Sequence, residues 1–194
     1  MTKEKWTNFS DADDQMSYAL IPHKTISKVK MMVTRGGYVT EQWTDGYATK
    51  SKSSEAVYLA CEFVVLGGQY DKRKIWNNIG LYSESSTKYA DIGRATIKAI
   101  LNSAKNLNPQ DKSAQAESNR VIKDFGDLND LEFVAEISVN DKGESPKNEI
   151  KVIITPDHAK YNEYMQPANG KYTIDAYKKA AAPEVELRND EMPF

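Results

Sequence analysis

The feature that most constrains the fold is a nearly continuous apolar run at residues 56–66, which reads Ala-Val-Tyr-Leu-Ala-Cys-Glu-Phe-Val-Val-Leu. β-Branched and aromatic residues favour strands, and a short apolar run bounded by turn residues is typical of a buried strand. Gly67 and Gly68 follow the run directly and supply that boundary. The run therefore predicts the central strand of a β-sheet.

Four further segments predict the strands that surround this run. Residues 26–35 alternate between apolar and polar positions, as a strand with one buried face does. Residues 70–82 predict the hairpin partner of the run, and residues 131–139 and 148–154 predict a second hairpin. Residues 38–53 contain an Asp-Gly pair between aromatic and β-branched residues, which is a hairpin signal, and they predict a projecting β-ribbon.

Residues 89–105 show apolar positions at helical spacing and predict one amphipathic helix. The polar stretch 106–129 predicts a loop with a helical turn near residues 121–125, and residues 157–165 predict a short helix. Five strands with one main helix between the third and fourth follow the element order of an OB-fold, a small, partly open barrel that binds single strands or oligosaccharides. The predicted class is mainly β (α+β), an OB-fold-like five-stranded barrel.

Length and composition divide the chain into three parts. The 194 residues suit one domain with tails. We expect a flexible N-terminal arm at residues 1–16, an OB-like domain at 17–165 and a flexible acidic C-terminal tail at 166–194.

The charge is distributed unevenly along the chain. The formal net charge is −2, but residues 23–76 carry nine Lys or Arg against five acids, a net of 9 − 5 = +4. A locally basic domain between acidic flanks is compatible with a nucleic-acid partner, although the average charge is not.

The residues that ordinarily build metal or catalytic sites are scarce. Cys61 is the single cysteine, and His23 and His158 are the two histidines, so neither an internal disulfide nor an ordinary zinc site is expected. Glu132 and Glu136 lie on one face of a predicted strand but about 13 Å apart, too far to share one Mg²⁺ for nuclease chemistry. We expect no cofactor, no metal and no catalytic residue.

Neither a membrane span nor a signal peptide is evident. No apolar run approaches the roughly 20 residues of a spanning helix, and the first residues lack a hydrophobic signal region. The expected location is the cytoplasm, that of the host cell if the protein is phage-encoded, with no membrane partner.

Aromatic residues are concentrated in the basic segment. Eight of the nineteen aromatics lie within residues 38–82, where bases stacked on rings and phosphates held by cations would suit single-stranded nucleic acid. The candidate cations are Lys28, Lys30, Lys50, Lys52, Lys72, Arg73 and Lys74, and the candidate stacking residues are Tyr38, Trp43, Tyr47 and Trp76. On an extended strand, Lys72, Lys74 and Trp76 would share one face. The alternative is that strand aromatics fill the core, which we expect for Tyr58 and Phe63.

The last five residues, Asp190, Glu191, Met192, Pro193 and Phe194, combine an acidic pair with a hydrophobe, a proline and a terminal phenylalanine. This ending resembles the acidic tails through which bacterial and phage single-stranded-DNA-binding proteins recruit replication and repair partners. The resemblance implies a partner-docking tip.

A second resemblance is internal. The strand Val-Tyr-Leu-Ala-Cys-Glu-Phe-Val-Val-Leu, the following Gly-Gly-Gln-Tyr-Asp-Lys-Arg-Lys-Ile-Trp-Asn-Asn and the Ile92-Gly93-Arg94 helix segment resemble a group of small phage-encoded proteins. That group is regarded as single-stranded-DNA-binding with an OB-type fold, and the resemblance covers roughly residues 18–155. Asp71-Lys72 and the polar insert at 106–129 depart from the pattern of the group.

These observations lead to one hypothesis and one alternative. The hypothesis is a non-catalytic, largely sequence-independent single-stranded-DNA-binding protein that supports phage DNA replication, recombination or repair, with homo-oligomerisation left open. The alternative is a virion or assembly protein that uses the barrel and the aromatic ribbon for protein–protein contacts.

Overall fold

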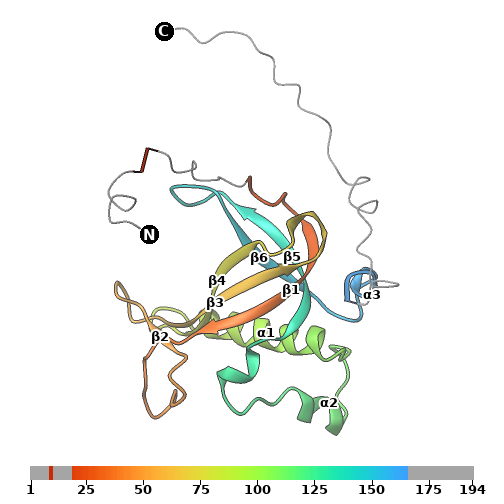
Figure 1. The fold of residues 1–194 in the computed structure, drawn as a ribbon. Coiled ribbons are helices and arrows are strands. Elements are labelled where there is room, and N and C mark those ends of the chain that lie inside the picture. Colours follow the sequence, from red (N-terminus) through yellow and green to blue (C-terminus); the bar gives the residue numbers. More distant parts are fainter. Residues whose placement is uncertain (1–8, 11–18, 166–194) are drawn as a thin grey trace, which may run out of the picture.

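A computed structural model describes residues 9–10 and 19–165, which form an antiparallel sheet packed against one main helix (Figure 1). The predicted α+β class is confirmed. The predicted tail at 166–194 and nearly all of the predicted arm at 1–16 lie outside the described residues.

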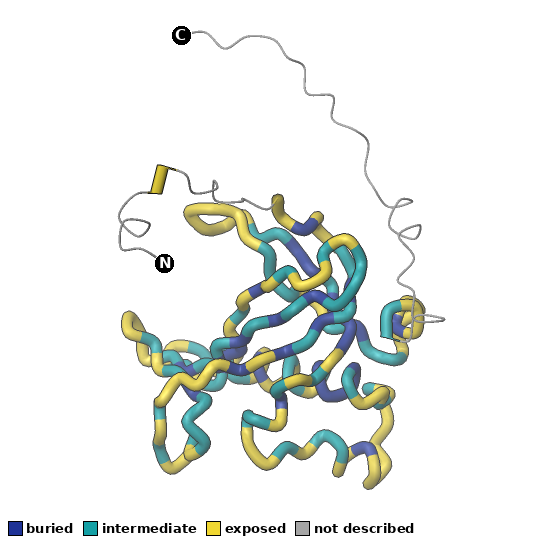
Figure 2. Tube along the Cα trace, in the orientation of Figure 1, coloured by how far each residue is buried: buried dark blue, intermediate teal, exposed yellow. Residues whose placement is uncertain are grey.

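β3 (Val57–Leu66) is the central strand, as the apolar run predicts. It pairs with β1 (Thr25–Thr34) along one edge and with β4 (Lys74–Tyr82) along the other. Every second residue of β3 is buried, and Figure 2 shows this alternation along the strand. The central position follows from this pattern, because each apolar side chain of the inner face packs against residues from both neighbouring strands.

β5 (Glu132–Asn140) pairs with β1, and β6 (Lys147–Ile154) pairs with β5, so the strand order is β4-β3-β1-β5-β6. β2 (Thr49–Lys50) adds two residues beside the start of β3. Apart from β2 and the first residues predicted for β4, the strands of the sheet are thus predicted correctly.

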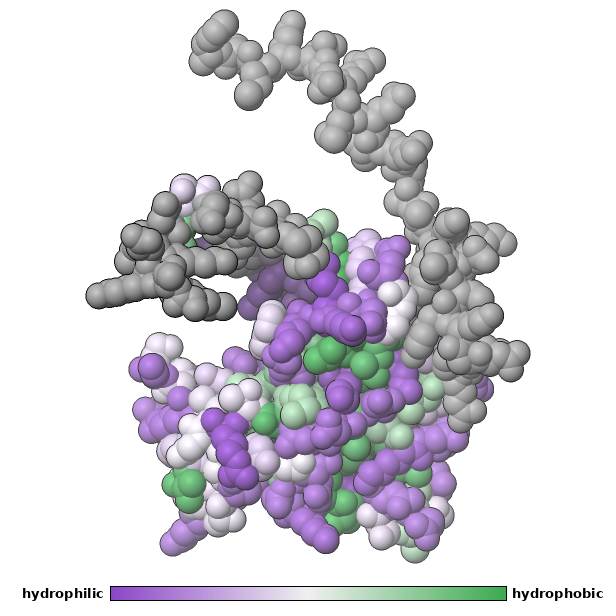
Figure 3. Space-filling view, in the orientation of Figure 1, coloured by the Kyte–Doolittle hydropathy of each residue, from purple (hydrophilic) through white to green (hydrophobic). Residues whose placement is uncertain are grey.

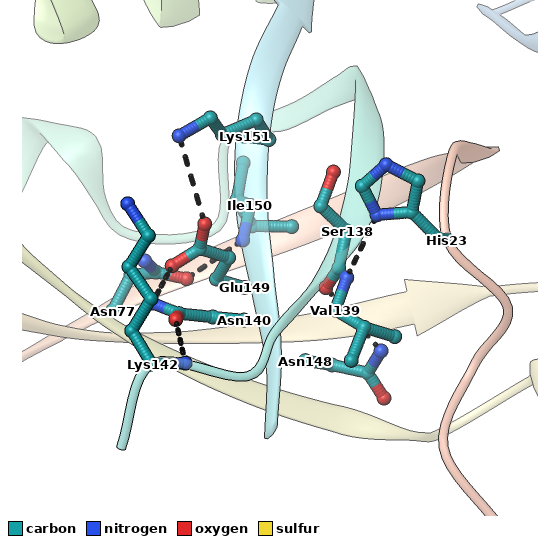
Figure 4. Close-up of polar contacts among 10 residues, drawn as sticks. All are labelled: His23, Asn77, Ser138, Val139, Asn140, Lys142, Asn148, Glu149, Ile150 and Lys151. Atoms are coloured by element: carbon teal, nitrogen blue, oxygen red, sulfur yellow. Dashed lines mark hydrogen bonds and ion pairs between the residues drawn. The ribbon is translucent and has the colours of Figure 1, made fainter. Parts of the chain in front are cut away.

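The sheet curls until β4 and β6, its two ends, approach each other without a backbone ladder between them in the described residues. The side chain of Asn77 on β4 bridges them, because its Oδ1 accepts a hydrogen bond of 2.7 Å from the backbone amide of Ile150 on β6 (Figure 4). Asn140 Nδ2 donates to Glu149 at 2.8 Å and fixes the β5–β6 hairpin beside this bridge. The sheet is therefore curved but is not a closed barrel.

The core fills the inner side of this curved sheet. Phe63 and Phe133 meet edge to face, with ring centroids 6.0 Å apart and an interplanar angle of 87°. Helix α1 (Thr87–Ala104) covers one end of the sheet with Ile100 and Leu101, in the position predicted for the amphipathic helix. Burial of these side chains is the main source of stability.

α1 approaches β4 very closely at a pair of glycines. A Cβ placed on Gly93 would lie 1.7 Å from the carbonyl oxygen of Gly80, and a Cβ on Gly80 would lie 2.6 Å from the ring of Tyr89. Neither position has room for a side chain, so Gly93 of the Ile92-Gly93-Arg94 segment serves helix–sheet packing, whereas Ile92 and Arg94 are exposed.

Three local predictions are wrong. The predicted β-ribbon at 38–53 is largely a loop. The amide of Gly37 donates to the carbonyl of Gly46, and the chain reverses between Thr40 and Trp43, before the Asp45-Gly46 pair that predicts a hairpin turn.

The segment 106–129, predicted to be a loop with one helical turn near 121–125, contains a short helix as well. Helix α2 (Ala114–Asn119) begins at an N-cap, Ser113, whose side chain accepts from the amide of Ala116, and a 3-10 turn follows at Phe125–Leu128. Short polar helices of this kind depend on caps, which hydrophobic periodicity does not register.

The turn after β3 also differs from its prediction. A 3-10 turn at Gly68–Tyr70 leads into Lys72, which adopts φ +64, and β4 begins only at Lys74. Lys72 is therefore not on the strand face that carries Lys74 and Trp76. After β6, helix α3 (Tyr161–Met165) confirms a short helix within 157–165, and it packs on the outer side of β5 against Val134.

Candidate nucleic-acid interface

The outer face of β1, β3 and β4 carries the most exposed tryptophan of the described residues. The strand register aligns Met32, Glu62 and Trp76 in one row across the three strands, and Lys30, Val64 and Lys74 in the next. Trp76 is 62% exposed in the interior of β4. An indole so placed contributes little to the core and is available to a flat partner.

A second group of rings lies where the loop after β1 meets the end of β4. The Trp43 ring lies 6.0 Å from that of Tyr38 and 6.4 Å from that of Tyr82, and the Lys50 ammonium lies 5.9 Å from the Tyr38 centroid. These residues line a hollow of about 480 Å³ together with Glu55. We call Tyr38, Trp43 and Tyr82 the ring cluster.

Close backbone packing positions the ring cluster. A Cβ on Gly36 would lie 2.0 Å from Thr49 Oγ1 and 2.3 Å from the carbonyl oxygen of Ala48, so only glycine lets the two arms of the loop approach. The amide of Tyr38 donates to the carbonyl of Ala48 across this contact. The loop thus holds its rings on ordered backbone although it contains almost no strand.

Tyr47 is placed differently from the other candidate rings. It packs against the hydrophobic core, the Arg35 guanidinium lies 4.7 Å from its ring centroid, and its hydroxyl accepts from Asn129 Nδ2. Asp45 accepts hydrogen bonds from the amides of Tyr47 and Phe125 and ties the loop to the 3-10 turn. These contacts give Tyr47 a supporting position in which it is partly buried.

Four of the seven candidate cations form ion pairs with carboxylates of the same chain. The four pairs are Lys28–Glu132 at 2.6 Å, Lys30–Asp130 at 3.4 Å, Lys50–Glu55 at 2.7 Å and Lys74–Glu62 at 3.0 Å. The hydrogen bond and the charge of Glu55 raise the pKa of Lys50. The lysines of the outer face are therefore largely compensated, and the face is less basic than the sequence of its strands suggests.

The remaining three candidate cations lie in turns. Lys52 and Lys72 are exposed and have no ion pair within the described part of the chain. Arg73 donates to the carbonyl oxygen of Ala19 at 2.9 Å and so holds the chain segment that precedes β1. Figure 3 shows a mainly hydrophilic surface, on which apolar groups form separate patches.

The structure thus divides the sequence-predicted residues into three sets. A sheet group contains Lys28, Lys30, Lys74 and Trp76, and a loop group contains Tyr38, Trp43 and Lys50. The other four, Tyr47, Lys52, Lys72 and Arg73, belong to neither group. Sequence reasoning did not select Tyr82 as a site residue or identify the compensating acids. One signal was present for Glu62, because a single acid within the apolar run marks the strand face that is not buried.

The structure bears on two other functional classes, metal-binding proteins and membrane-spanning proteins. No group of three or more His, Cys, Asp or Glu in the described part of the chain is placed to hold a metal ion. None of its helices combines the length and hydrophobicity needed to cross a bilayer. The tip, Asp190 to Phe194, lies outside the described residues.

Comparisons of the chain with protein-family models, with curated proteins and with solved structures gave no match.

Proposed function

We propose that the protein is a non-catalytic, largely sequence-independent single-stranded-DNA-binding protein built on an OB-type, partly open barrel. The strand order β4-β3-β1-β5-β6, with the main helix between β4 and β5, supports the OB-type assignment. In that fold, the face of the second and third strands and the loop after the first strand bind the ligand. Here the corresponding elements are β3, β4 and residues 35–56.

The observation that carries the proposal is the exposure of Trp76. An indole that is 62% exposed in the middle of a strand leaves a large apolar surface in water. Bases present such a surface with a matching ring, and stacking one base on an aromatic side chain is worth about 1–3 kcal/mol. The ring cluster at the end of the same strand offers further stacking surface.

The ion pairs determine how such a site would respond to salt. When Lys74 or Lys28 leaves its carboxylate partner, Glu62 or Glu132, to bind a phosphate, the freed carboxylate attracts a salt cation from solution. The uptake of this cation offsets the release of a counterion from the DNA. Contacts from seven uncompensated cations would give a slope of log K against log salt near −5, at about −0.7 per contact. We expect a shallower negative slope, with stacking supplying a large part of the affinity.

The test is a titration with oligo-dT followed by intrinsic tryptophan fluorescence, repeated at several salt concentrations and with duplex DNA. Oligo-dT should quench the tryptophan fluorescence of the wild-type protein, and the protein should bind duplex DNA more weakly than oligo-dT. Trp76→Ala should weaken binding by about 5- to 150-fold, the equivalent of one lost stack, whereas Trp76→Phe keeps a ring and should lose much less. Val121→Ala is the matched control, since Val121 is 71% exposed and lies outside the proposed interface. Equal affinity of wild type and Trp76→Ala for oligo-dT would exclude the proposed interface.

One observation favours a second candidate function, a virion or assembly protein. The exposed rings also suit a protein–protein interface, where aromatic residues are enriched, and the ion pairs of Lys28 and Lys74 leave this face with little uncompensated charge. Such a protein should self-associate or bind a protein partner with little salt dependence and should not bind oligo-dT. Sedimentation at low and high salt, alongside the titration, separates the two candidates.

The same proposal assigns residues 190–194 to the recruitment of replication, recombination or repair proteins in the cytoplasm. Deleting residues 184–194 should leave the oligo-dT affinity unchanged or raised, because the segment is acidic and competes with phosphate for cations. A large loss of affinity would overturn this assignment.

A further inference from the structure

A second hollow, of about 490 Å³, lies between α1, Trp43 and the 3-10 turn at Phe125–Leu128. Its apolar lining includes Trp43, Leu81 and Phe125. Its volume falls within the range of small-molecule sites, about 300–1,000 Å³. The hollow therefore has room for an aromatic group of the size of a base.

The charged residues that line this hollow are all cationic. They are Arg94, Lys98 and Arg120, and no acidic residue lines it. Arg94 and Lys98 lie four residues apart, which places them on one side of α1, and neither has an ion pair within the described residues. Asp91, at i−3 from Arg94, does not pair with it. The hollow thus combines uncompensated positive charge with apolar walls, unlike the outer face of the sheet.

Arg120 forms a fixed wall of the hollow. Its guanidinium donates three hydrogen bonds, at 2.7 Å to Asn102 Oδ1, 2.7 Å to the carbonyl of Asp111 and 2.9 Å to the carbonyl of Asn108. Hydrogen bonds from Ser113, and then the charge of Arg120, lower the pKa of the nearby Asp111 carboxyl. Arg120 is therefore held in place, and Arg94 and Lys98 are the cations available to a ligand.

Trp43 connects the two hollows. It lines the hollow that holds Tyr38, Lys50 and Tyr82, and it also lines the hollow beside α1. A chain of bases and phosphates that contacts the ring cluster would reach Arg94 and Lys98 by passing Trp43. Consecutive stacking surfaces and cations of this kind are what an extended single strand requires.

We propose that the hollow beside α1 is a second nucleotide subsite, which receives one base of a single strand against Trp43 and Phe125 and holds the neighbouring phosphates with Arg94 and Lys98. This inference rests on the proposed function. It extends the nucleic-acid strand from the sheet across the middle of α1, where Arg94 and Lys98 offer positive charge without a compensating acid in the described residues. The complementarity between these two cations and the phosphates identifies the occupant as a nucleotide.

The test compares Arg94→Gln/Lys98→Gln with Lys88→Gln/Lys160→Gln, which removes the same charge from two exposed positions outside both hollows. Affinity for oligo-dT is measured across a salt series. The first variant should bind at least about tenfold more weakly at low salt, and its slope should be shallower by about 1.4, the value for two phosphate contacts. The control should stay close to wild type in both quantities.

A second readout follows Trp43 directly. Trp6→Phe/Trp76→Phe leaves Trp43 as the single tryptophan, and saturating oligo-dT should quench its fluorescence. Adding Arg94→Gln/Lys98→Gln to this background should reduce the quenching, because Trp43 can then stack only on the side of the hollow that it shares with Tyr38 and Tyr82.

The outcomes separate the two proposals. If wild type binds oligo-dT and Trp76→Ala weakens binding, but Arg94→Gln/Lys98→Gln matches its control and Trp43 is not quenched, the second subsite is refuted while the proposed function stands. If wild type does not bind oligo-dT, both proposals fail.

Discussion

Replacing Gly93 by alanine should destabilise the protein, although the same change usually stabilises a helix. Alanine gains about 1 kcal/mol over glycine in a helix interior. At Gly93, however, the new Cβ would lie 1.7 Å from the carbonyl oxygen of Gly80 and 2.8 Å from its carbonyl carbon. Ordinary contact begins near 3.4 Å, so helix and strand must separate by about 1.7 Å at this point.

The size of the effect follows from what that separation disturbs. The obstacle is backbone and cannot rotate away, and Ile100 and Leu101 on the same helix are buried against the sheet. Overpacking typically costs about 1–3 kcal/mol, and the upper part of that range applies to a rigid obstacle. After subtraction of the helix-propensity gain, we expect a loss of about 2 kcal/mol, or about 4–8 °C in Tm for a domain of this size.

The assay is urea unfolding followed by circular dichroism, with thermal unfolding alongside. Ala95→Gly on the exposed side of α1 provides the control for helix propensity and should cost about 1 kcal/mol. A double-mutant cycle identifies the obstacle, because a Cβ on Gly80 meets the Tyr89 side chain. Tyr89→Ala should therefore relieve much of the cost of Gly80→Ala but little of the cost of Gly93→Ala. A Gly93→Ala protein as stable as wild type would refute the close approach of α1 and β4.

Three further predictions concern single side chains. Glu62→Gln removes the carboxylate that pairs with Lys74, beside Trp76, and should raise the oligo-dT affinity and steepen the slope of log K against log salt by about 0.7. The control, Glu117→Gln on α2, should change neither quantity, and a loss of affinity in Glu62→Gln would count against the interface. Ser103→Ala should lower the free energy of unfolding by about 1–3 kcal/mol, measured with urea. The buried Ser103 hydroxyl donates to the carbonyl of Ile154 on β6 at 2.7 Å and accepts from the amide of Val134 on β5 at 3.1 Å, so its loss leaves both groups without this partner. An unchanged urea midpoint would show that these groups find other partners. Burial raises the pKa of the Cys61 thiol to about 12, so iodoacetamide at about pH 8 should label it only as fast as the protein unfolds. Because the folded chain keeps this proton while the unfolded chain loses it, stability should fall as the pH rises from about 9 towards 12.

Local pattern was sufficient where a segment buries one face. β3, β1, α1, β5 and β6 lie close to their predicted positions because the spacing of apolar residues reflects contact with a common core. Prediction failed in segments whose order comes from other interactions. The loop before β2 is held by Asp45 and by glycine contacts, and α2 is held by the Ser113 cap, none of which leaves an apolar period.

The candidate site shows the same division. Sequence alone determined that aromatic and basic residues are concentrated between residues 23 and 82, and that one strand face carries Lys74 and Trp76. Tertiary structure decided which charges remain uncompensated: acids from β3, β5 and neighbouring loops pair with the lysines of the sheet, while Arg94 and Lys98 line a hollow without an acid. The reason is physical, since a side chain's type is set by the chain at one position, whereas its electrostatic environment is a sum over neighbours that are distant in sequence and meet only when the sheet curls.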